Sequence, residues 1–229
     1  MAVAVSVTAS GSGDLNGVSS RTINGASIGT AASDRIVIFC ELISNQDGTG
    51  FSTTGVTIGG VTATAITAAV SFQSNVYRIR CWWALVPTGT TANIVSTYSE
   101  TSSSLPDIYN YVVYRVVGAD TTTPISASTT ATDTDSSAAA SLAIPASGAG
   151  IGFSATGGTR TFTWTNLTED TDFNNASNGE TSSSASSTSS GTSTRTATCT
   201  GVNQQLGLIL FAIQPPTGDT LTNQTLRFM

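Results

Sequence analysis

The acidic segment "DTDFNNASNGE", which begins at Asp170, carries the side-chain oxygens that calcium prefers. Asp170, Asp172 and Asn174 occupy the first, third and fifth positions of a calcium-binding loop. The sixth position, where such a loop needs glycine, is Asn175, and Glu180 stands at the eleventh position instead of the twelfth. The flanking residues indicate strands, whereas calcium loops of this kind lie between helices. We therefore predict a polar loop here, and a protein without a metal or other cofactor.

Catalytic chemistry has few candidate residues in this chain. Histidine and lysine are both absent, so Ser-His-Asp, Cys-His and Schiff-base arrangements are excluded. A pair of carboxylates, the minimum for glycoside hydrolysis, could come from Glu41, Glu100 and Asp107. Acidic residues at strand ends are more commonly solvated turn residues, so we predict that the protein is not an enzyme.

The three cysteines, Cys40, Cys81 and Cys199, all fall in predicted strands and show no zinc-ligand spacing. We expect them to be small buried apolar residues. The alternative is that one thiol faces a neighbouring chain and forms an intermolecular disulfide outside the reducing cytoplasm.

Charge and hydroxyl content describe the surface. The net charge is −6, and the eight cations, all arginines, form no cluster, which argues against binding nucleic acid through its phosphates. With 32 serines and 40 threonines, the surface must consist mostly of hydroxyl groups. We find neither a signal peptide nor a membrane-spanning window, and we expect synthesis in a cytoplasm and no membrane partner.

Strand patterns recur along nearly the whole chain, bounded by Gly, Pro, Asn and Ser clusters, and no amphipathic helical stripe interrupts them. This spacing predicts an all-β protein with very little helix, an antiparallel β-sandwich of jelly-roll type. No internal repeat is apparent. The predicted strands are 2–9, 34–43, 55–67, 76–86, 92–99, 108–117, 124–130, 139–145, 149–155, 160–165, 194–200 and 206–214.

We predict a single β-sandwich domain over residues 1–214. The strands at 108–117 and 206–214 are apolar on both faces, so they should be central and covered on both sides by long loops or another subunit. The Ser-rich segment 174–193 is predicted to be a long loop.

Residues 215–229 follow a double proline and are predicted to form an extended C-terminal arm. Its tip is apolar, and we expect Leu226 and Phe228 to lie against a neighbouring chain. The alternative is that the arm folds back on its own sandwich.

Trp82 and Trp83 are adjacent in a strand, so their side chains point to opposite faces. Trp83 shares its face with apolar residues and should be core. Trp82 shares its face with Arg78 and Arg80, and Trp and Arg are both enriched at protein interfaces. We predict that these three residues form an assembly interface. Cover by a loop of the same chain, with an arginine stacked on Trp82, and a sugar-binding platform are the alternatives.

The stretches "GVTIGGVTATAI", "CWWALVPTGTTANIVSTYS" and "TFTWTNLTED", together with the composition, resemble Ser/Thr-rich β-sandwich virion proteins of tailed bacteriophages and prophages. The resemblance extends from about residue 34 to 213 and transfers no site residues. It implies a capsid decoration, neck, tail or fibre component located in the virion.

We therefore expect a non-enzymatic virion structural protein that acts through protein–protein assembly, as a homo-oligomer and with other virion proteins. The alternative function is a carbohydrate-binding host-adhesion module. In that case a host surface glycan would be the partner, and Trp82, Tyr98 or Tyr109 would form the sugar platform.

Overall fold

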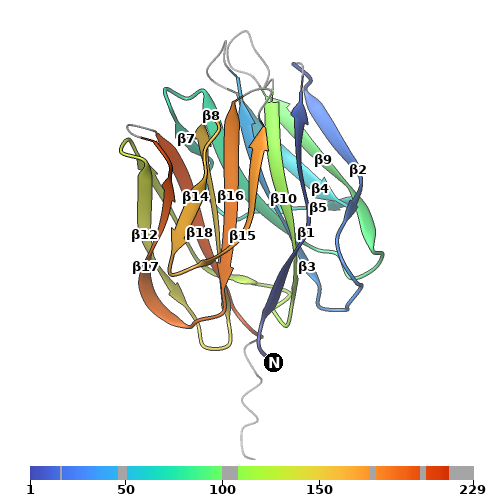
Figure 1. Cartoon of the computed structure of the whole chain (residues 1–229). Coiled ribbons are helices and arrows are strands. Elements are labelled where there is room, and N and C mark those ends of the chain that lie inside the picture. The colour runs from blue at the N-terminus through green and yellow to red at the C-terminus, as the bar shows by residue number, and fades with distance from the viewer. Residues whose placement is uncertain (16, 46–50, 100–107, 176–178, 202–204, 217–229) are drawn as a thin grey trace, which may run out of the picture.

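Four antiparallel β-sheets make up the computed structural model of this chain (Figure 1). The structure describes residues 1–229 except 16, 46–50, 100–107, 176–178, 202–204 and 217–229. Among the described residues there is no helix. The predictions of an all-β protein, of antiparallel pairing and of a β-sandwich are confirmed. The jelly-roll type stays a prediction.

The two central sheets are the larger ones. Sheet A has the order β1 (Ala4–Asp14), β10 (Ile108–Val117), β3 (Ile36–Ser44), β8 (Tyr77–Leu85) and β6 (Thr64–Ala65), and β7 (Val70–Phe72) also pairs with β8. Sheet C has the order β11 (Ile125–Asp133), β18 (Leu206–Ile213), β13 (Ala149–Gly157), β16 (Glu180–Ser187) and β15 (Thr168–Asn175).

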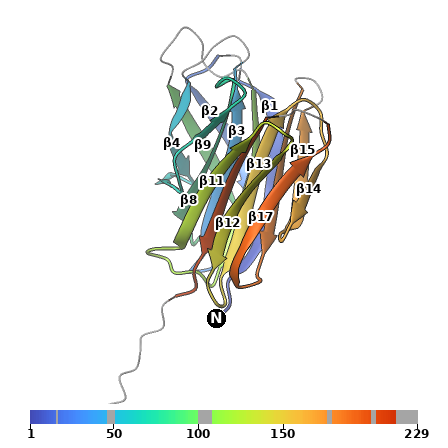
Figure 2. The ribbon, with the colours of Figure 1, turned by 90° about the vertical axis from the view of Figure 1, so that its left-hand side faces the viewer.

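The two outer sheets cover them. Sheet B has the order β2 (Ser20–Ser27), β9 (Thr91–Ser99), β4 (Ser52–Ile58) and β5 (Val61–Thr62). Sheet D has the order β12 (Ser137–Ile144), β17 (Gly191–Cys199) and β14 (Phe162–Thr165). In Figure 1 sheet D lies on the left and sheet B on the right, and Figure 2 shows the stack after a quarter turn.

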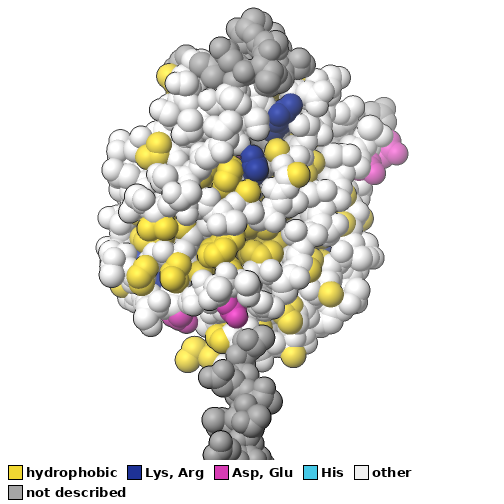
Figure 3. Space-filling model, turned by 180° about the vertical axis from the view of Figure 1, so that it is seen from behind, with side chains coloured by type: hydrophobic (Ala, Val, Ile, Leu, Met, Phe, Trp, Pro, Cys, Tyr) yellow, Lys and Arg dark blue, Asp and Glu magenta, His cyan; other side chains and the backbone are white. Residues whose placement is uncertain are grey.

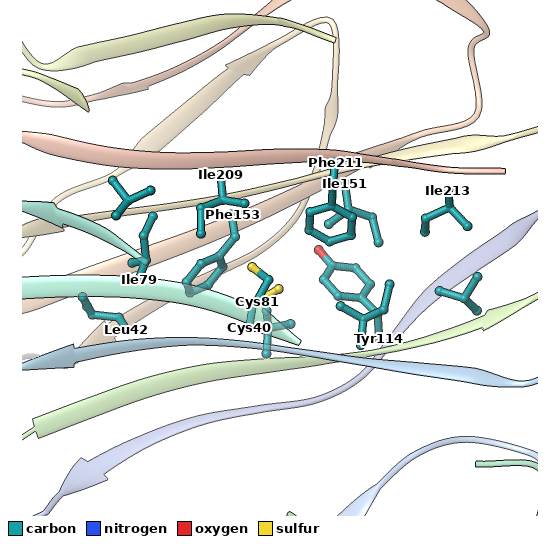
Figure 4. Close-up of a cluster of buried hydrophobic side chains, with 14 of the residues drawn as sticks. Cys40, Leu42, Ile79, Cys81, Tyr114, Ile151, Phe153, Ile209, Phe211 and Ile213 are labelled. Atoms are coloured by element: carbon teal, nitrogen blue, oxygen red, sulfur yellow. The ribbon is translucent and has the colours of Figure 1, made fainter. Parts of the chain in front are cut away.

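In the described part of the chain, four apolar clusters fill the spaces between consecutive sheets, two of them between sheets B and A, so the layers run B, A, C, D. One cluster joins sheets B and A through residues such as Ile58, Trp82 and Ile94. The largest joins sheets A and C, and another joins C and D. Figure 4 shows the largest cluster, in which Tyr114 from sheet A and Phe211 from sheet C approach one another.

The prediction that strands 108–117 and 206–214 are central is confirmed. They are β10 and β18, each with a strand on either side, and every residue of β18 is buried. Side chains alternate as the period of two requires: Ile209 and Phe211 enter the A–C cluster, whereas Leu208 and Leu210 enter the C–D cluster. Their second faces are covered by further sheets of the same chain, in place of the loops or the subunit that we expected.

The two halves of the chain repeat one strand order. Sheet A begins β1-β10-β3-β8, and sheet C follows with β11-β18-β13-β16. In the outer sheets, β2-β9-β4 corresponds to β12-β17-β14. Residues before Gly118 thus build sheets A and B, residues after Pro124 build sheets C and D, and both halves contribute to the A–C cluster. The two halves share the order in which their strands connect and pair, but not their amino acids. This explains why the sequence shows no internal repeat.

The Ser-rich segment 174–193 is not a long loop, and that prediction is wrong. It contains the end of β15, all of β16 and the start of β17. β16 lies between β13 and β15 in sheet C, so its backbone is hydrogen-bonded on both sides. Runs of serine indicate loops because the hydroxyl competes with the backbone for hydrogen bonds. Here the hydroxyls have other partners: the indole Nε1 of Trp164 donates to Ser183 Oγ at 2.8 Å, and Ser186 Oγ donates to Asp170 Oδ1 at 3.0 Å.

Overpacking β16 tests its burial. Ala185 is fully buried in the C–D cluster, so Ala185→Leu should lower the free energy of unfolding by about 1–3 kcal/mol. Thr188→Leu, at an exposed position beyond the end of β16, should change it by less than about 0.5 kcal/mol. Urea unfolding followed by circular dichroism measures both. Equal, small effects would mean that the segment is not packed as described.

Several predictions concern the ends of the chain and its division into domains. Pro215 and Pro216 follow β18, which ends at Ile213. The remainder of the predicted arm, with Leu226 and Phe228, lies outside the described residues. The division into one domain at 1–214 and an arm at 215–229 stays a prediction. No helix in the described part of the chain has the length and apolarity needed to cross a membrane.

Candidate functional site

Trp82 is 4% exposed and belongs to the cluster between sheets A and B. The expectation that its indole is exposed for a partner is therefore wrong, although the two tryptophans do point to opposite faces. Sheet B supplies the cover, because β4 and β9 lie over the outer face of sheet A. Trp83, predicted to be core, is only partly buried against the A–C cluster. The opposing strand β6 at Trp83 is two residues long, so this side chain lies near an open edge of sheet A.

Arg78 and Arg80 project from the same face as Trp82 and are half-buried. The guanidinium of Arg80 lies 4.4 Å from the centroid of the Trp82 ring, and its Nη1 donates to the Thr53 carbonyl at 2.7 Å. The guanidinium of Arg78 lies 5.4 Å from the Phe51 ring. The alternative of cover by the same chain, with an arginine stacked on the indole, fits this arrangement, except that the cover is sheet B and not a loop. An interface formed by these three residues would first require sheet B to move.

Glu41 faces the same interior from β3, directly across from Arg80 on β8. Its side chain is 1% exposed, and its Oε2 accepts a hydrogen bond from Ser96 Oγ at 3.1 Å. Burial raises the pKa of this carboxyl to about 7, while hydrogen bonds and the charge of Arg80 oppose the shift. A substrate has no access to a carboxyl so deeply buried, so this titrating group affects stability rather than a surface reaction.

The proposed sugar platforms are also buried. Tyr98 is 5% exposed and Tyr109 is 4% exposed. The guanidinium of Arg21 lies 3.4 Å from the Tyr109 ring centroid, and Tyr111 stacks against Tyr109 at 5.9 Å. With Trp82 buried as well, none of the three aromatic rings presents a face on which a sugar could stack.

The acidic segment that resembles a calcium loop does not gather its oxygens at one point. Asp170 Oδ2 accepts from the Tyr114 hydroxyl at 2.9 Å, and Asp172 Oδ2 accepts from the Phe162 amide at 3.2 Å. Asn174 Oδ1 accepts from the hydroxyl of Thr181. Glu180 Oε1 accepts from Ser44 Oγ of sheet A at 2.9 Å. The described residues include no group of three His, Cys, Asp or Glu side chains that could hold a metal ion.

The remaining candidate site residues from the sequence are two carboxylates and three thiols. Glu100 and Asp107 lie outside the described residues, so their separation from Glu41 is not defined. Cys40, Cys81 and Cys199 are all buried and unpaired, which confirms the prediction that they are small core residues. Cys40 and Cys81 lie directly opposite each other on β3 and β8 (Figure 4).

A cavity of about 430 Å³, which the sequence did not indicate, lies between the turn after β7 and the β11–β12 hairpin. Three consecutive residues of that turn, Gln73, Ser74 and Asn75, have φ values of 50°, 56° and 68°, in the left-handed region that non-glycine residues seldom adopt. The turn is held by a hydrogen bond from the Gln73 amide to Gln205 Oε1 at 2.5 Å. The lining is mostly amides and hydroxyls, with Asp133 as its carboxylate. This chemistry suits a hydroxylated ligand.

A second cavity, of about 330 Å³, lies at one end of the C–D interface and is lined by five Ser and Thr side chains from the end of β16 to the start of β17, and by Arg195. Both cavities are built from residues far apart in the sequence. Figure 3 shows that the back face of the molecule has few charged side chains, and that its apolar side chains gather in a band across the middle of a mostly polar surface. Polar cavities on such a surface leave no distinct signal in the composition.

No protein-family model matches the chain, and no curated protein matches it. Solved structures with some similarity include an anti-sigma factor domain-containing protein, with a TM-score of 0.25 and 8% identity over 89% of this chain and 88% of that one. The structure of infectious bursal disease virus Gt strain has a TM-score of 0.29 and 12% identity, over 96% of this chain and 42% of that one. The PBSX exported protein XepA has a TM-score of 0.26 and 13% identity, over 91% and 86%. Likenesses of this size carry no argument about function.

Proposed function

We propose that this chain is a non-enzymatic structural protein of a bacteriophage particle, a capsid decoration, neck, tail or fibre component that acts through protein–protein assembly. The observation that carries the proposal is that each of the two central sheets has one long edge strand without an internal charge. The phage particle is suggested by the resemblance of the strand sequences to Ser/Thr-rich virion proteins.

These edge strands are β1 in sheet A and β11 in sheet C; the opposite edges are the short strands β6 and β7 in sheet A, and the acidic strand β15 in sheet C. β1 is 11 residues long and β11 is 9 residues long, and the acidic residue of each, Asp14 or Asp133, is its last. Soluble proteins usually protect such edges with charges, prolines or bulges, because unpaired backbone groups invite another strand. Each of these edges has one bulge, after Val7 in β1 and after Ile125 in β11, which leaves most of its length regular. Strand addition by another subunit fits these edges.

The placement of the buried acids supports a role without catalysis. Glu41 on β3 accepts a hydrogen bond from Ser96 of sheet B, whereas Glu180 bonds to Ser44 on the opposite face of sheet A. A glycosidase needs two carboxyls at one accessible point, about 5–10 Å apart. Sheet A separates these two, so they do not form such a pair.

Assembly is favoured over the alternative of a carbohydrate-binding host-adhesion module. That alternative relied on Trp82, Tyr98 or Tyr109 as an exposed platform, and all three are buried. The proposed partners are further copies of this chain and other virion proteins, and the proposed location is the virion.

Charged substitutions on the edge strands test assembly. Ser6 in β1 and Thr130 in β11 are exposed, so Ser6→Lys and Thr130→Lys should leave the monomer stable. We expect self-association, measured by analytical ultracentrifugation over a concentration series, to weaken at least about tenfold in the double variant, because lysines block edge pairing. Thr121→Lys, at an exposed site outside the strands, is the control. A wild-type chain that stays monomeric, or a double variant that associates normally, would refute edge pairing.

Location in a particle needs its own measurement. Virus particles released by the organism that encodes the chain should contain it in many copies, detectable by mass spectrometry of purified particles and by antibody labelling in electron micrographs. Particles without the chain would overturn the virion proposal, and hydrolysis of glycans by the purified chain would overturn the non-enzymatic role.

A further inference from the structure

The cavity of about 330 Å³ at the end of the C–D interface has a buried cation in its lining. Arg195 is 2% exposed and projects from β17 on the same face as Ala197, toward sheet C. The other charged residues of the chain are absent from this lining, so within the described residues the cavity has a positive charge and no negative one. Burying an uncompensated charge is costly, so the position of Arg195 needs an explanation.

The hydrogen bonds of Arg195 use only part of its guanidinium. Nη1 donates to the Leu142 carbonyl, and also to the Ser193 carbonyl at 3.0 Å. Nε is buried and has no partner among the described residues. Burial lowers the pKa of Arg195, and no neighbouring charge in the described part of the chain contributes to or opposes this shift. Nε and Nη2 form the side of the guanidinium that pairs with a planar anion through two parallel hydrogen bonds.

Arg35 in the other half of the chain shows what a purely structural buried arginine looks like here. It is fully buried, and all three nitrogens donate to backbone carbonyls. Nε bonds to Val86 at 2.7 Å, Nη1 to Gly29 at 2.7 Å and Gly89 at 2.9 Å, and Nη2 to Thr88 at 2.6 Å. Arg35 lines neither of the two cavities. A buried Nε without a partner also occurs in Arg21, Arg78, Arg80 and Arg160, but Arg195 is the one of these five that lines either cavity.

Hydroxyl groups supply most of the remaining lining, together with Asn166, Leu167 and Gly191. Ser187, Ser189, Ser190, Thr192 and Ser193 line the cavity. Each hydroxyl can both donate and accept a hydrogen bond, as the hydroxyls of a sugar do. Asn166, also in the lining, is fixed by a hydrogen bond from Nδ2 to the Thr194 carbonyl at 2.8 Å. The volume is at the lower end of the range for small-molecule sites, which suits one monosaccharide.

We propose that this cavity binds a sugar carrying a carboxylate, such as a uronic acid, with Arg195 pairing with the carboxylate and the Ser and Thr side chains bonding to the sugar hydroxyls. The ligand needs no aromatic platform, because charge and hydroxyl pairing provide the recognition. This inference goes beyond assembly and does not depend on it.

Titration of the ¹⁵N-labelled full chain with sodium glucuronate, followed by NMR, tests the proposal. We expect saturable shifts confined to amides around the cavity. Glucose, which has the hydroxyls without the carboxylate, should give at least about tenfold weaker binding, and so should inorganic phosphate, which has the charge without the sugar. Equal binding of phosphate and glucuronate would show that only an anion is recognised, and equal binding of glucose would exclude a role for the carboxylate. Absence of saturable shifts, or shifts at another place, would overturn the site.

Substitutions test whether Arg195 itself binds glucuronate. Arg195→Gln keeps a donor for the Leu142 carbonyl but removes the charge, and it should weaken glucuronate binding at least about tenfold. Arg35→Gln, the matched buried arginine, should leave the affinity unchanged. Should Arg195→Gln fail to fold, Ser190→Leu at an exposed position of the rim fills the cavity and should abolish binding. Unchanged affinity in a folded Arg195→Gln or in Ser190→Leu would refute the assignment.

Discussion

Trp82→Ala is expected to lower the free energy of unfolding by about 3–5 kcal/mol, because it removes a large side chain from the centre of the A–B cluster and leaves a cavity. Trp83→Ala should cost only about 1–2 kcal/mol, since Trp83 is half-buried and packs against its cluster from the side. This order is the reverse of the one that the strand pattern predicted. Urea unfolding of the isolated chain, with fits to a two-state transition, measures both values.

Trp82→Phe tests how much of the loss in stability comes from the lost apolar volume and the lost aromatic ring. It keeps most of the apolar volume and a ring for Arg80, so it should recover at least half of the loss. If Trp83→Ala proved equal to or more damaging than Trp82→Ala, sheet B would not be covering β8 as described.

Stability is expected to fall as the pH rises from about 4.5 to 7. Burial raises the pKa of both Glu41 and Glu180 to about 7 in the folded chain, against 4.5 for an ordinary glutamate. Between these values the folded state holds protons that the unfolded state has released, so each rise in pH favours unfolding. Each group should contribute up to about 3 kcal/mol to the fall. Below pH 4.5 both states are protonated and the contribution is fully present, and above pH 7 it is lost.

Glutamine substitutions show how much of the pH dependence of stability comes from each carboxyl. Glu41→Gln and Glu180→Gln should each remove about half of the fall, and the double variant should be nearly flat between pH 5 and pH 7.5. Burial also raises the pKa of Asp170, which leaves a small residual slope. Asp135→Asn, at an exposed position, is the control and should keep the full slope. Free energies of unfolding in urea at several pH values provide the measurement, and stability that rises with pH would contradict the buried positions of both acids.

Local patterns were sufficient for the class of fold and for much of its core. Alternation in β3, β8, β10 and β18 correctly divided their side chains between two faces. Because both faces of β10 and β18 are apolar, the sequence correctly predicted that they are central strands. These successes depend only on the period of two, which each strand carries in its own residues.

The covering of those faces was decided by the tertiary structure. Alternation shows that Arg78, Arg80 and Trp82 share a face, but it does not show whether water, a partner or another sheet lies beyond it. Here sheet B does, and its strand β2 carries no clear pattern. For the same reason β16 was not recognised, since serines are accepted in a buried strand only when neighbouring strands and side chains bond to them.

For the candidate sites, too, the sequence determined some properties and the tertiary structure decided others. The absence of histidine and lysine excluded several chemistries without reference to the fold. Arg195, by contrast, is one of eight arginines and has no distinguishing neighbours in the sequence. Its significance comes from packing, which removes it from water beside hydroxyls brought together from the ends of different strands. Burial and the pairing of a charge are properties of the folded chain, because they depend on contacts between residues distant in sequence.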